Sequence, residues 1–351
     1  MHAAPVPFRP RPAAVPMTEV ERHVPGDGRS RLRGVAVAAL LLGTTVMVGI
    51  VAWYGMAQVG AAVMEGIIVL PATALVYLTQ IGLSAQAWRT VVPRPRPPPW
   101  LMFQARWVRE AVNCLLPVAN IGGGIAGIRL LTRTAGLAAV PAGASLTVDV
   151  TVEALTLVLF LISGVAAVWM ISTDNTLLDS AWVWTSLGVA AGAVAAFVVA
   201  QRLGLVKLVE AVFRRVFPAS LAGKPGQIHG AMMTIYARPG VLVRAVAWHL
   251  LSWSFGAAEV WILSRALGHP VSPAAAYGIE SLGLAARTTF FVIPGGLAAQ
   301  EAGFLLVGLL VGLPPSISLA ISMLKRLREL AVNIPGVLRW QWLEGRALFR
   351  A

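Results

Sequence analysis

The sequence has little charge and almost no cysteine for its length. Only 12% of its 351 residues are charged, 57% are hydrophobic, and the mean hydropathy is +0.75. Soluble domains carry about 25% charged residues, so this composition excludes an ordinary soluble protein. The single cysteine, Cys114, excludes an internal disulfide and a cysteine-based metal cluster. The five histidines show no HxxxH spacing, and we therefore expect no bound metal and no cofactor.

Acidic residues are also scarce. The chain has 15 Asp and Glu against 28 Lys and Arg, which gives a formal net charge of +13. In a soluble protein this excess would suggest a nucleic-acid partner. In a membrane protein it is expected in cytoplasmic loops that face anionic lipid headgroups. We therefore expect no nucleic-acid partner.

Long apolar runs dominate the chain. Runs long enough to cross about 30 Å of hydrocarbon lie near residues 34–54, 67–88, 142–171, 181–201, 241–264 and 316–338. Basic residues concentrate in 1–33, 89–109 and 202–238, whereas 55–66 and 172–180 have none. This alternation predicts an all-α polytopic membrane protein with about six full spans and both termini in the cytoplasm.

The composition also divides the chain into segments. Residues 1–33 are rich in proline and arginine, and we expect them to form a disordered basic cytoplasmic tail. Residues 34–345 form the predicted transmembrane domain, with half-repeats at about 34–171 and 181–338. Residues 346–351 form a short C-terminal tail.

Two segments do not fit simple spans. Residues 109–131 and 277–313 each follow the order helix, proline, glycine-rich break, helix. The predicted break residues are Pro117, Gly122, Gly123, Gly124, Pro294, Gly295 and Gly296. Broken helices in corresponding positions of two halves indicate re-entrant hairpins that line a site. Each half would hold two spans, a hairpin and a third span, and this odd number of crossings predicts an inverted repeat.

The first break also contains a GxGxxG pattern, formed by Gly122, Gly124 and Gly127. A dinucleotide site would require a preceding strand within a βαβ unit. A helix-like segment that stops at Pro117 precedes the pattern instead. We interpret these glycines as positions of close backbone approach at a helix break.

Charged residues inside the apolar segments are the candidate site. The candidate substrate-binding residues are Glu301, Arg287, Glu280, Lys325, Arg326, Arg328, Glu329, Asp149, Glu153, Arg129 and Glu110; Glu259 interrupts a further span. A charge at mid-bilayer costs about 2.5–3.5 kcal/mol on insertion scales, so these charges must pair or line water. One interpretation is a set of structural ion pairs. The other is a hydrated midplane cavity that accepts a polar or anionic lipid headgroup, with Glu301 facing it. We expect Asp149 or Glu153 to pair with Lys325, Arg326 or Arg328.

Four stretches carry a family resemblance. "REAVNCLLPVANIGGGIAGIRLL", "SLTVDVTVEALT", "YGIESLGLAARTTFFVIPGGLAAQEAGF" and "SLAISMLKRLRELAVNIPG" together resemble the hopanoid-biosynthesis-associated membrane proteins. Those proteins are a branch of the flippase-like family named for the transmembrane region of lysylphosphatidylglycerol synthase. The likeness covers about residues 34–345. The family has Gly-Gly-Glu at the first break, where this chain has Gly122, Gly123 and Gly124, so only the second-break acid, Glu301, carries over.

The resemblance implies a multi-pass protein of the bacterial inner membrane that translocates or handles lipid. Its expected partners are membrane lipids, either hopanoid or anionic phospholipid, and hopanoid-biosynthesis enzymes are candidate protein partners. One alternative is a non-transporting scaffold for those enzymes. Another is an enzyme that transfers an amino acid to phosphatidylglycerol. That chemistry needs a soluble acyltransferase domain, which we do not expect here, so we predict that the chain is not an enzyme.

Overall fold

The structure is a computed structural model that describes residues 41–116, 122–171, 181–203, 225–289 and 297–348. Within these ranges the chain forms helices and short connections, without a strand. The predicted tail at 1–33, the loop at 172–180, Pro117 and 294–296 lie outside the described residues. The helices of the described residues confirm the predicted all-α fold class.

The helices follow the predicted segments closely. After a helix at Leu41–Trp53, the first part of the chain contains α2 (Met56–Gly66), the short 3-10 helix η2 (Ile67–Val69), α3 (Leu70–Val91), α4 (Pro99–Leu115), α5 (Gly122–Thr134), α6 (Ala139–Ile171) and α7 (Ala181–Arg202). The second part contains α10 (Pro225–Tyr236), α11 (Pro239–Ala266), α12 (Pro273–Thr289), α13 (Ala299–Leu310) and α14 (Pro315–Leu348).

Proline and glycine set several of these boundaries. Proline occupies the first turn of α3, α4 and α11, where its missing N–H leaves no helical bond unmade. Gly268 follows α11 with φ +70°, and Gly312 follows α13 with φ +79°. This left-handed conformation suits glycine, and it turns the chain sharply at the end of each helix.

The helices of the two halves correspond in order and length. The shift that carries Pro117 onto Pro294 also carries Gly122, the start of α5, onto Ala299, the start of α13. It carries Ile171, the end of α6, onto Leu348, the end of α14. The α4–α5 hairpin therefore matches the α12–α13 hairpin, and α6 matches α14.

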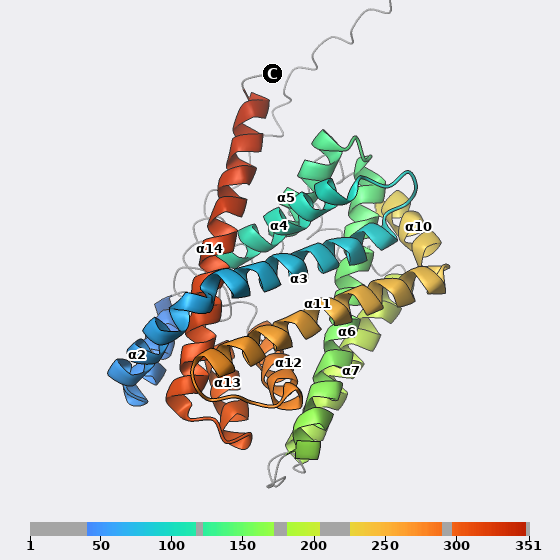
Figure 1. The fold of residues 1–351 in the computed structure, drawn as a ribbon. Coiled ribbons are helices and arrows are strands. Elements are labelled where there is room, and N and C mark those ends of the chain that lie inside the picture. Colours follow the sequence, from blue (N-terminus) through green and yellow to red (C-terminus); the bar gives the residue numbers. More distant parts are fainter. Residues whose placement is uncertain (1–40, 117–121, 172–180, 204–224, 290–296, 349–351) are drawn as a thin grey trace, which may run out of the picture.

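Packing repeats this correspondence. The matching helices α3 and α11 lie side by side at the centre, with α14 on one side and α6 on the other (Figure 1). Helix α4 packs on α14, and its counterpart α12 packs on α6, so each hairpin contacts the long helix of the other half. The connections before and after the first hairpin, 92–98 and 135–138, lie at one end of the molecule. Those before and after the second hairpin, 267–272 and 311–314, lie at the opposite end (Figure 1).

Each hairpin has its own apolar core. One core surrounds Trp88 and joins α3, α4, α5, α6 and α10. The other surrounds Phe304 and joins α2, α11, α12, α13 and α14. The charged residues described below lie on α4 and α6 of the first half and on α11, α12, α13 and α14 of the second.

Among the described residues, three helical segments are apolar and long enough to cross a membrane, namely Met56–Val91, Ala139–Ile171 and Pro239–Ala266. Helix α14 has 34 residues and is about 51 Å long at 1.5 Å per residue, but it carries several charges near its middle. The structure thus shows a helical membrane protein, while the number of spans and the side of each terminus stay predictions.

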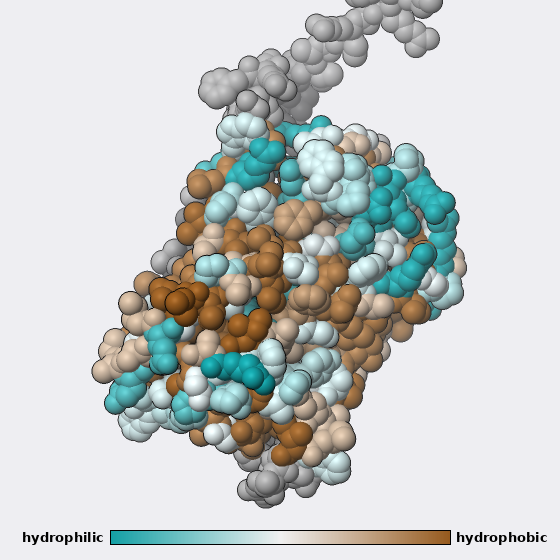
Figure 2. Space-filling model, in the orientation of Figure 1, coloured by the Kyte–Doolittle hydropathy of each residue, from teal (hydrophilic) through white to brown (hydrophobic). Residues whose placement is uncertain are grey.

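The surface supports a membrane setting. Figure 2 shows hydrophobic residues across the middle of one face and hydrophilic residues gathered at its upper end, over the α3–α4 loop and α10. Arginines concentrate at that end. The pKa of Arg96, in the α3–α4 loop, is lowered below its ordinary value, first by partial burial and then by the nearby charges of Arg94, Arg89, Arg244 and Arg238. An anionic membrane surface attracts a cluster of arginines such as these five.

Candidate functional site

A set of ion pairs lies in the interior of the described chain. It divides into two groups that we name by their residues. The first charge cluster consists of Arg106, Arg109, Glu110, Asp149, Glu153 and His249. The second charge cluster consists of Glu259, Glu280, Arg287, Glu301, Lys325, Arg326, Arg328 and Glu329.

Helix α14 supplies most of the second cluster. Lys325 Nζ lies 2.9 Å from Glu259 Oε2 of α11 and 2.9 Å from Glu280 Oε2 of α12. Arg328 binds both oxygens of Glu259, with Nε 2.7 Å from Oε1. One carboxylate of α11 therefore neutralises two cations of α14, and Glu280 adds the second negative charge.

The Arg328 guanidinium also stacks on α3. Its central carbon lies 3.9 Å from the centre of the Tyr77 ring. A cation over an aromatic face gains about 2 kcal/mol when both groups are desolvated. Arg328 is thus fixed by contacts from α11 and α3 and is almost completely buried.

Glu301 lies in the first turn of α13 and is completely buried. Its Oε1 is 3.0 Å from Arg326 Nε and accepts a hydrogen bond of 3.2 Å from the Ser322 hydroxyl. Both partners belong to α14. Glu301 therefore tethers the second hairpin to α14 through a charge-assisted hydrogen bond.

Arg287 forms an ion pair with Glu329 near the second break. Arg287 Nη1 also donates to Gln300 Oε1 at 3.1 Å, which links the two helices of the second hairpin. Cys114, near the end of α4, lies with its Sγ 3.9 Å from Glu329 Oε2. The helices that lead into the two breaks therefore meet at one carboxylate of α14.

The first cluster joins α4 to α6. Arg109 Nη1 lies 2.9 Å from Asp149 Oδ2, and Arg109 Nη2 lies 2.7 Å from Glu153 Oε2. Arg106 contacts the same two carboxylates and also Glu110, one turn along its own helix, at 2.7 Å. Asp149 and Glu153 lie on one face of α6, as their spacing of four residues predicted.

These contacts correct one prediction. Asp149 and Glu153 do not take Lys325, Arg326 or Arg328 as partners; they pair with Arg106 and Arg109, and the α14 cations pair with Glu259, Glu280, Glu301 and Glu329. The reason is the helix arrangement. Helix α4 brings its own arginines to α6, while the α14 cations face α11, α12 and α13.

Three members of this network are not among the predicted site residues. Arg106 and Arg109 fall in the basic region 89–109 of the sequence, but both lie within α4 and are buried. Their three-residue spacing on an otherwise apolar helix face was the available signal. His249 gave no signal, because a lone histidine in an apolar run has no partner in sequence.

The remaining predicted residues have other positions. Arg129 is exposed on α5 and joins neither cluster among the described contacts. In the first break, Gly122, Gly123 and Gly124 form the first turn of α5, and the Gly123 N–H donates to Asn113 Oδ1 at 2.9 Å. A Cβ on Gly123 would lie 2.2 Å from the Arg109 carbonyl oxygen, so this glycine allows the close approach of α4 and α5.

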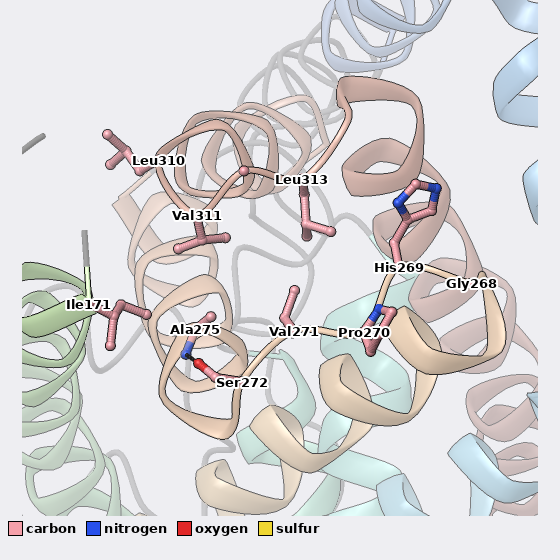
Figure 3. A pocket seen from close by; sticks show the side chains of 11 residues that line it. Ile171, Gly268, His269, Pro270, Val271, Ser272, Ala275, Leu310, Val311 and Leu313 are labelled. Atoms are coloured by element: carbon pink, nitrogen blue, oxygen red, sulfur yellow. Dashed lines mark hydrogen bonds between the residues drawn. The ribbon is translucent and has the colours of Figure 1, made fainter. Parts of the chain in front are cut away.

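A pocket of about 560 Å³ lies away from these charges (Figure 3). It is formed by the end of α6, the α11–α12 connection and the turn after α13. Val311, Leu313 and Val271 face it, with Leu310 and His269 at its edge (Figure 3). Its lining includes none of the paired charges, so the hydrated midplane cavity expected around Glu301 stays a prediction.

Two buried clusters of paired charges, held by helices of both halves and placed beside two broken helices, define a polytopic membrane protein with a polar interior. Residues 34–336 match the family described as the lysylphosphatidylglycerol synthase TM region, and the chain belongs to that family. No curated relative and no solved structure matches the chain. The family gives the protein a membrane-lipid-related role, and the hopanoid association rests on the sequence resemblance alone.

Proposed function

We propose that the protein moves a lipid headgroup between the two leaflets of a membrane, along the charged residues between its two hairpins. The observation that carries this proposal is the position of the charges. Ion pairs lie close to the ends of α4 and α12, the helices that lead into the two breaks. The two halves of the fold also meet at these charges, because His249 of α11 contacts Asp149 of α6 and Cys114 of α4 contacts Glu329 of α14. Intramembrane charges in such positions are commonly functional.

The exposures of the charged side chains suggest where a headgroup would first bind. Arg287 is the most exposed cation of the second cluster, with 23% of its side chain accessible, against 13% for Arg326 and 5% for Lys325. An anionic phosphate that replaces Glu329 at Arg287 would satisfy the same guanidinium. Movement would then proceed by exchange of ion pairs, so that no charge is left alone in the apolar interior.

The two clusters differ in the charge that they can offer. Glu110 and Glu153 are the most exposed carboxylates of the first cluster, at 30% and 21% of their side chains. They could hold the cationic part of a zwitterionic headgroup while Arg287 holds the phosphate.

We further propose that the halves are inverted with respect to the membrane. The arginine-rich end at the α3–α4 loop and α10 would face the cytoplasm, and the connections 267–272 and 311–314 would face the other side. One hairpin would then open to each side, which supports alternating access to the same charges.

The membrane is proposed to be a bacterial inner membrane and the lipid a hopanoid or an anionic phospholipid, because the sequence resembles proteins associated with hopanoid biosynthesis. A scaffold that gathers hopanoid enzymes without moving lipid is the second candidate. It is favoured by the ion pairs themselves, in which each charged residue of the two clusters has a partner of opposite charge, because such pairs would also serve a purely structural role.

The test is a lipid-movement assay in reconstituted vesicles with labelled phosphatidylglycerol and labelled phosphatidylethanolamine. Wild type should move at least one probe faster than protein-free vesicles. Arg287→Gln should slow the anionic probe more than the zwitterionic one. Arg244→Gln, which removes an exposed arginine at the basic end, serves as the control and should leave both rates unchanged. If wild type moves neither probe, the transport proposal is wrong and the scaffold leads.

A further inference from the structure

The charges of the ion-pair network do not balance. The pairs between described residues contain seven carboxylates, Glu110, Asp149, Glu153, Glu259, Glu280, Glu301 and Glu329. They contain six permanent cations, Arg106, Arg109, Arg287, Lys325, Arg326 and Arg328. The second cluster has four charges of each sign, so the excess negative charge belongs to the first cluster.

One residue in the first cluster can supply the missing positive charge. His249 of α11 lies with Nε2 3.2 Å from Asp149 Oδ1, and both side chains are completely buried. Imidazole is the side chain whose charge ordinarily changes between about pH 5 and 8. A proton on His249 would give the first cluster three charges of each sign.

The second ring nitrogen of His249 marks where that proton binds. In the neutral ring, Nε2–H donates to Asp149, and Nδ1 keeps a free lone pair. Nδ1 is buried and has no hydrogen-bond partner among the described residues. A buried polar atom without a partner is uncommon in folded proteins and requires an explanation.

The groups that surround His249 come from several helices. Helix α6 contributes Asp149 and Glu153, and α4 contributes Arg106 and Arg109 through those carboxylates. From α3, the Ser84 hydroxyl hydrogen-bonds at 2.9 Å to the hydroxyl of Ser252, which lies three residues after His249 on α11. Neither group is charged. The titratable groups of α10 are His229 and Tyr236, the latter bound to Gln201. Glu280 of α12 and Lys325 and Arg328 of α14 gather around Glu259, nearly three turns further along α11. The other charges in the second cluster on these two helices, Arg287, Arg326 and Glu329, pair with one another and with Glu301.

We propose that His249 and Asp149 form a proton-binding site and that a proton taken up there is the coupling ion of the lipid movement. The site binds one proton at His249 Nδ1, which turns a neutral imidazole into an imidazolium beside the Asp149 carboxylate. The positive charge of the imidazolium lets Asp149 pair with His249 alone, so that Arg109 becomes available to a headgroup phosphate. Loss of the proton returns Arg109 to Asp149. Glu153, with 21% of its side chain accessible, shares both arginines with Asp149.

The proton site can be tested without any transport. Histidine-selective ¹⁵N labelling of the full chain in detergent, followed by NMR over pH 5 to 9, reports the titration of each imidazole. One titrating signal should be lost in His249→Gln. In Asp149→Asn, which removes the excess carboxylate, that signal should move to lower pH. His269→Gln is the matched control and should remove a different signal. If His249→Gln removes no titrating signal, or if Asp149→Asn leaves its titration unchanged, the proton site is wrong.

The coupling rests on the proposed lipid movement and needs a second measurement. Vesicles with labelled phosphatidylglycerol receive an imposed pH difference of one unit. With one proton per lipid, the leaflet ratio of the probe should shift by up to about tenfold in wild type, and it should not respond in His249→Gln. A wild-type protein that moves lipid with no response to the gradient overturns the coupling and keeps the site. If wild type moves no lipid at all, the proposed function fails, while NMR still decides the proton site.

Discussion

Arg287 and Glu329 form an ion pair that joins the end of α12 to the middle of α14, and the Cys114 thiol at the end of α4 contacts the same carboxylate. One side chain therefore receives contacts from both hairpins. Arg287 is also the most exposed cation of the second charge cluster, with 23% of its side chain accessible. This position makes Glu329 the residue at which a structural role and a transport role can be separated.

Glu329→Gln should destabilise the protein. It leaves Arg287 without its carboxylate in an apolar setting, and breaking a buried ion pair by removing one partner costs about 3–5 kcal/mol. The measurement is the unfolding midpoint of the purified protein in detergent. Glu65→Gln, the same change at an exposed position on α2, should leave the midpoint in place. Equal midpoints for both variants would contradict a stabilising pair.

The pairing of α6 with α4 predicts a specific rescue. Asp149→Asn should destabilise the protein by a smaller amount, about 1.5–3 kcal/mol, because Arg109 loses a partner at 2.9 Å but keeps Glu153 at 2.7 Å. Exchanging the charges, as Asp149→Arg with Arg109→Asp, should recover part of that stability. The exchange of Asp149 with Arg326 should recover none, since each has other partners. Rescue by Arg326 in place of Arg109 would refute the pairing described above.

The first break depends on a glycine. Gly123→Ala would place a Cβ 2.2 Å from the Arg109 carbonyl oxygen and 2.4 Å from Asn113 Oδ1, so α5 must move away from α4. Overpacking of this kind costs about 1–3 kcal/mol, and it should also disturb the first charge cluster. Gly192→Ala on α7, where no atom lies within 4 Å of the new Cβ, is the control. Alanine there should be neutral or slightly stabilising, by up to about 1 kcal/mol. Thermal unfolding of the two variants side by side decides the matter.

The membrane orientation can be read with single cysteines. Cys114→Ser provides a background without other thiols. In that background, Ala138→Cys in the α5–α6 connection should be protected from an impermeant maleimide added to intact cells, and Ser272→Cys before α12 should be labelled. Both positions are exposed in the structure, so access to the side chain is not limiting. Labelling with the opposite pattern would reverse the proposed orientation, and labelling of both from one side would exclude inverted halves.

Local patterns predicted the helical segments well. The expected run at 241–264 corresponds to α11 at Pro239–Ala266, and the expected run at 142–171 corresponds to α6 at Ala139–Ile171. The match of the two halves was also visible, because one shift aligns Pro117 with Pro294 and the helices that follow. The length of an apolar run and the positions of proline and glycine can be read from neighbouring residues. They affect the local backbone in the same way whatever the tertiary structure.

The sequence by itself therefore determined that this is a helical membrane protein with two broken segments and a set of charges that need partners. Only the tertiary structure decided which partners they have. Asp149 and Arg109 are 40 residues apart in sequence, and nothing local distinguishes Arg109 from Lys325 as the cation for Asp149. The choice depends on how each helix is rotated about its axis and on which helices pack together. The same packing brings His249 to Asp149 across 100 residues of chain, and it turned an unremarked histidine into the residue that completes the charge of the first cluster.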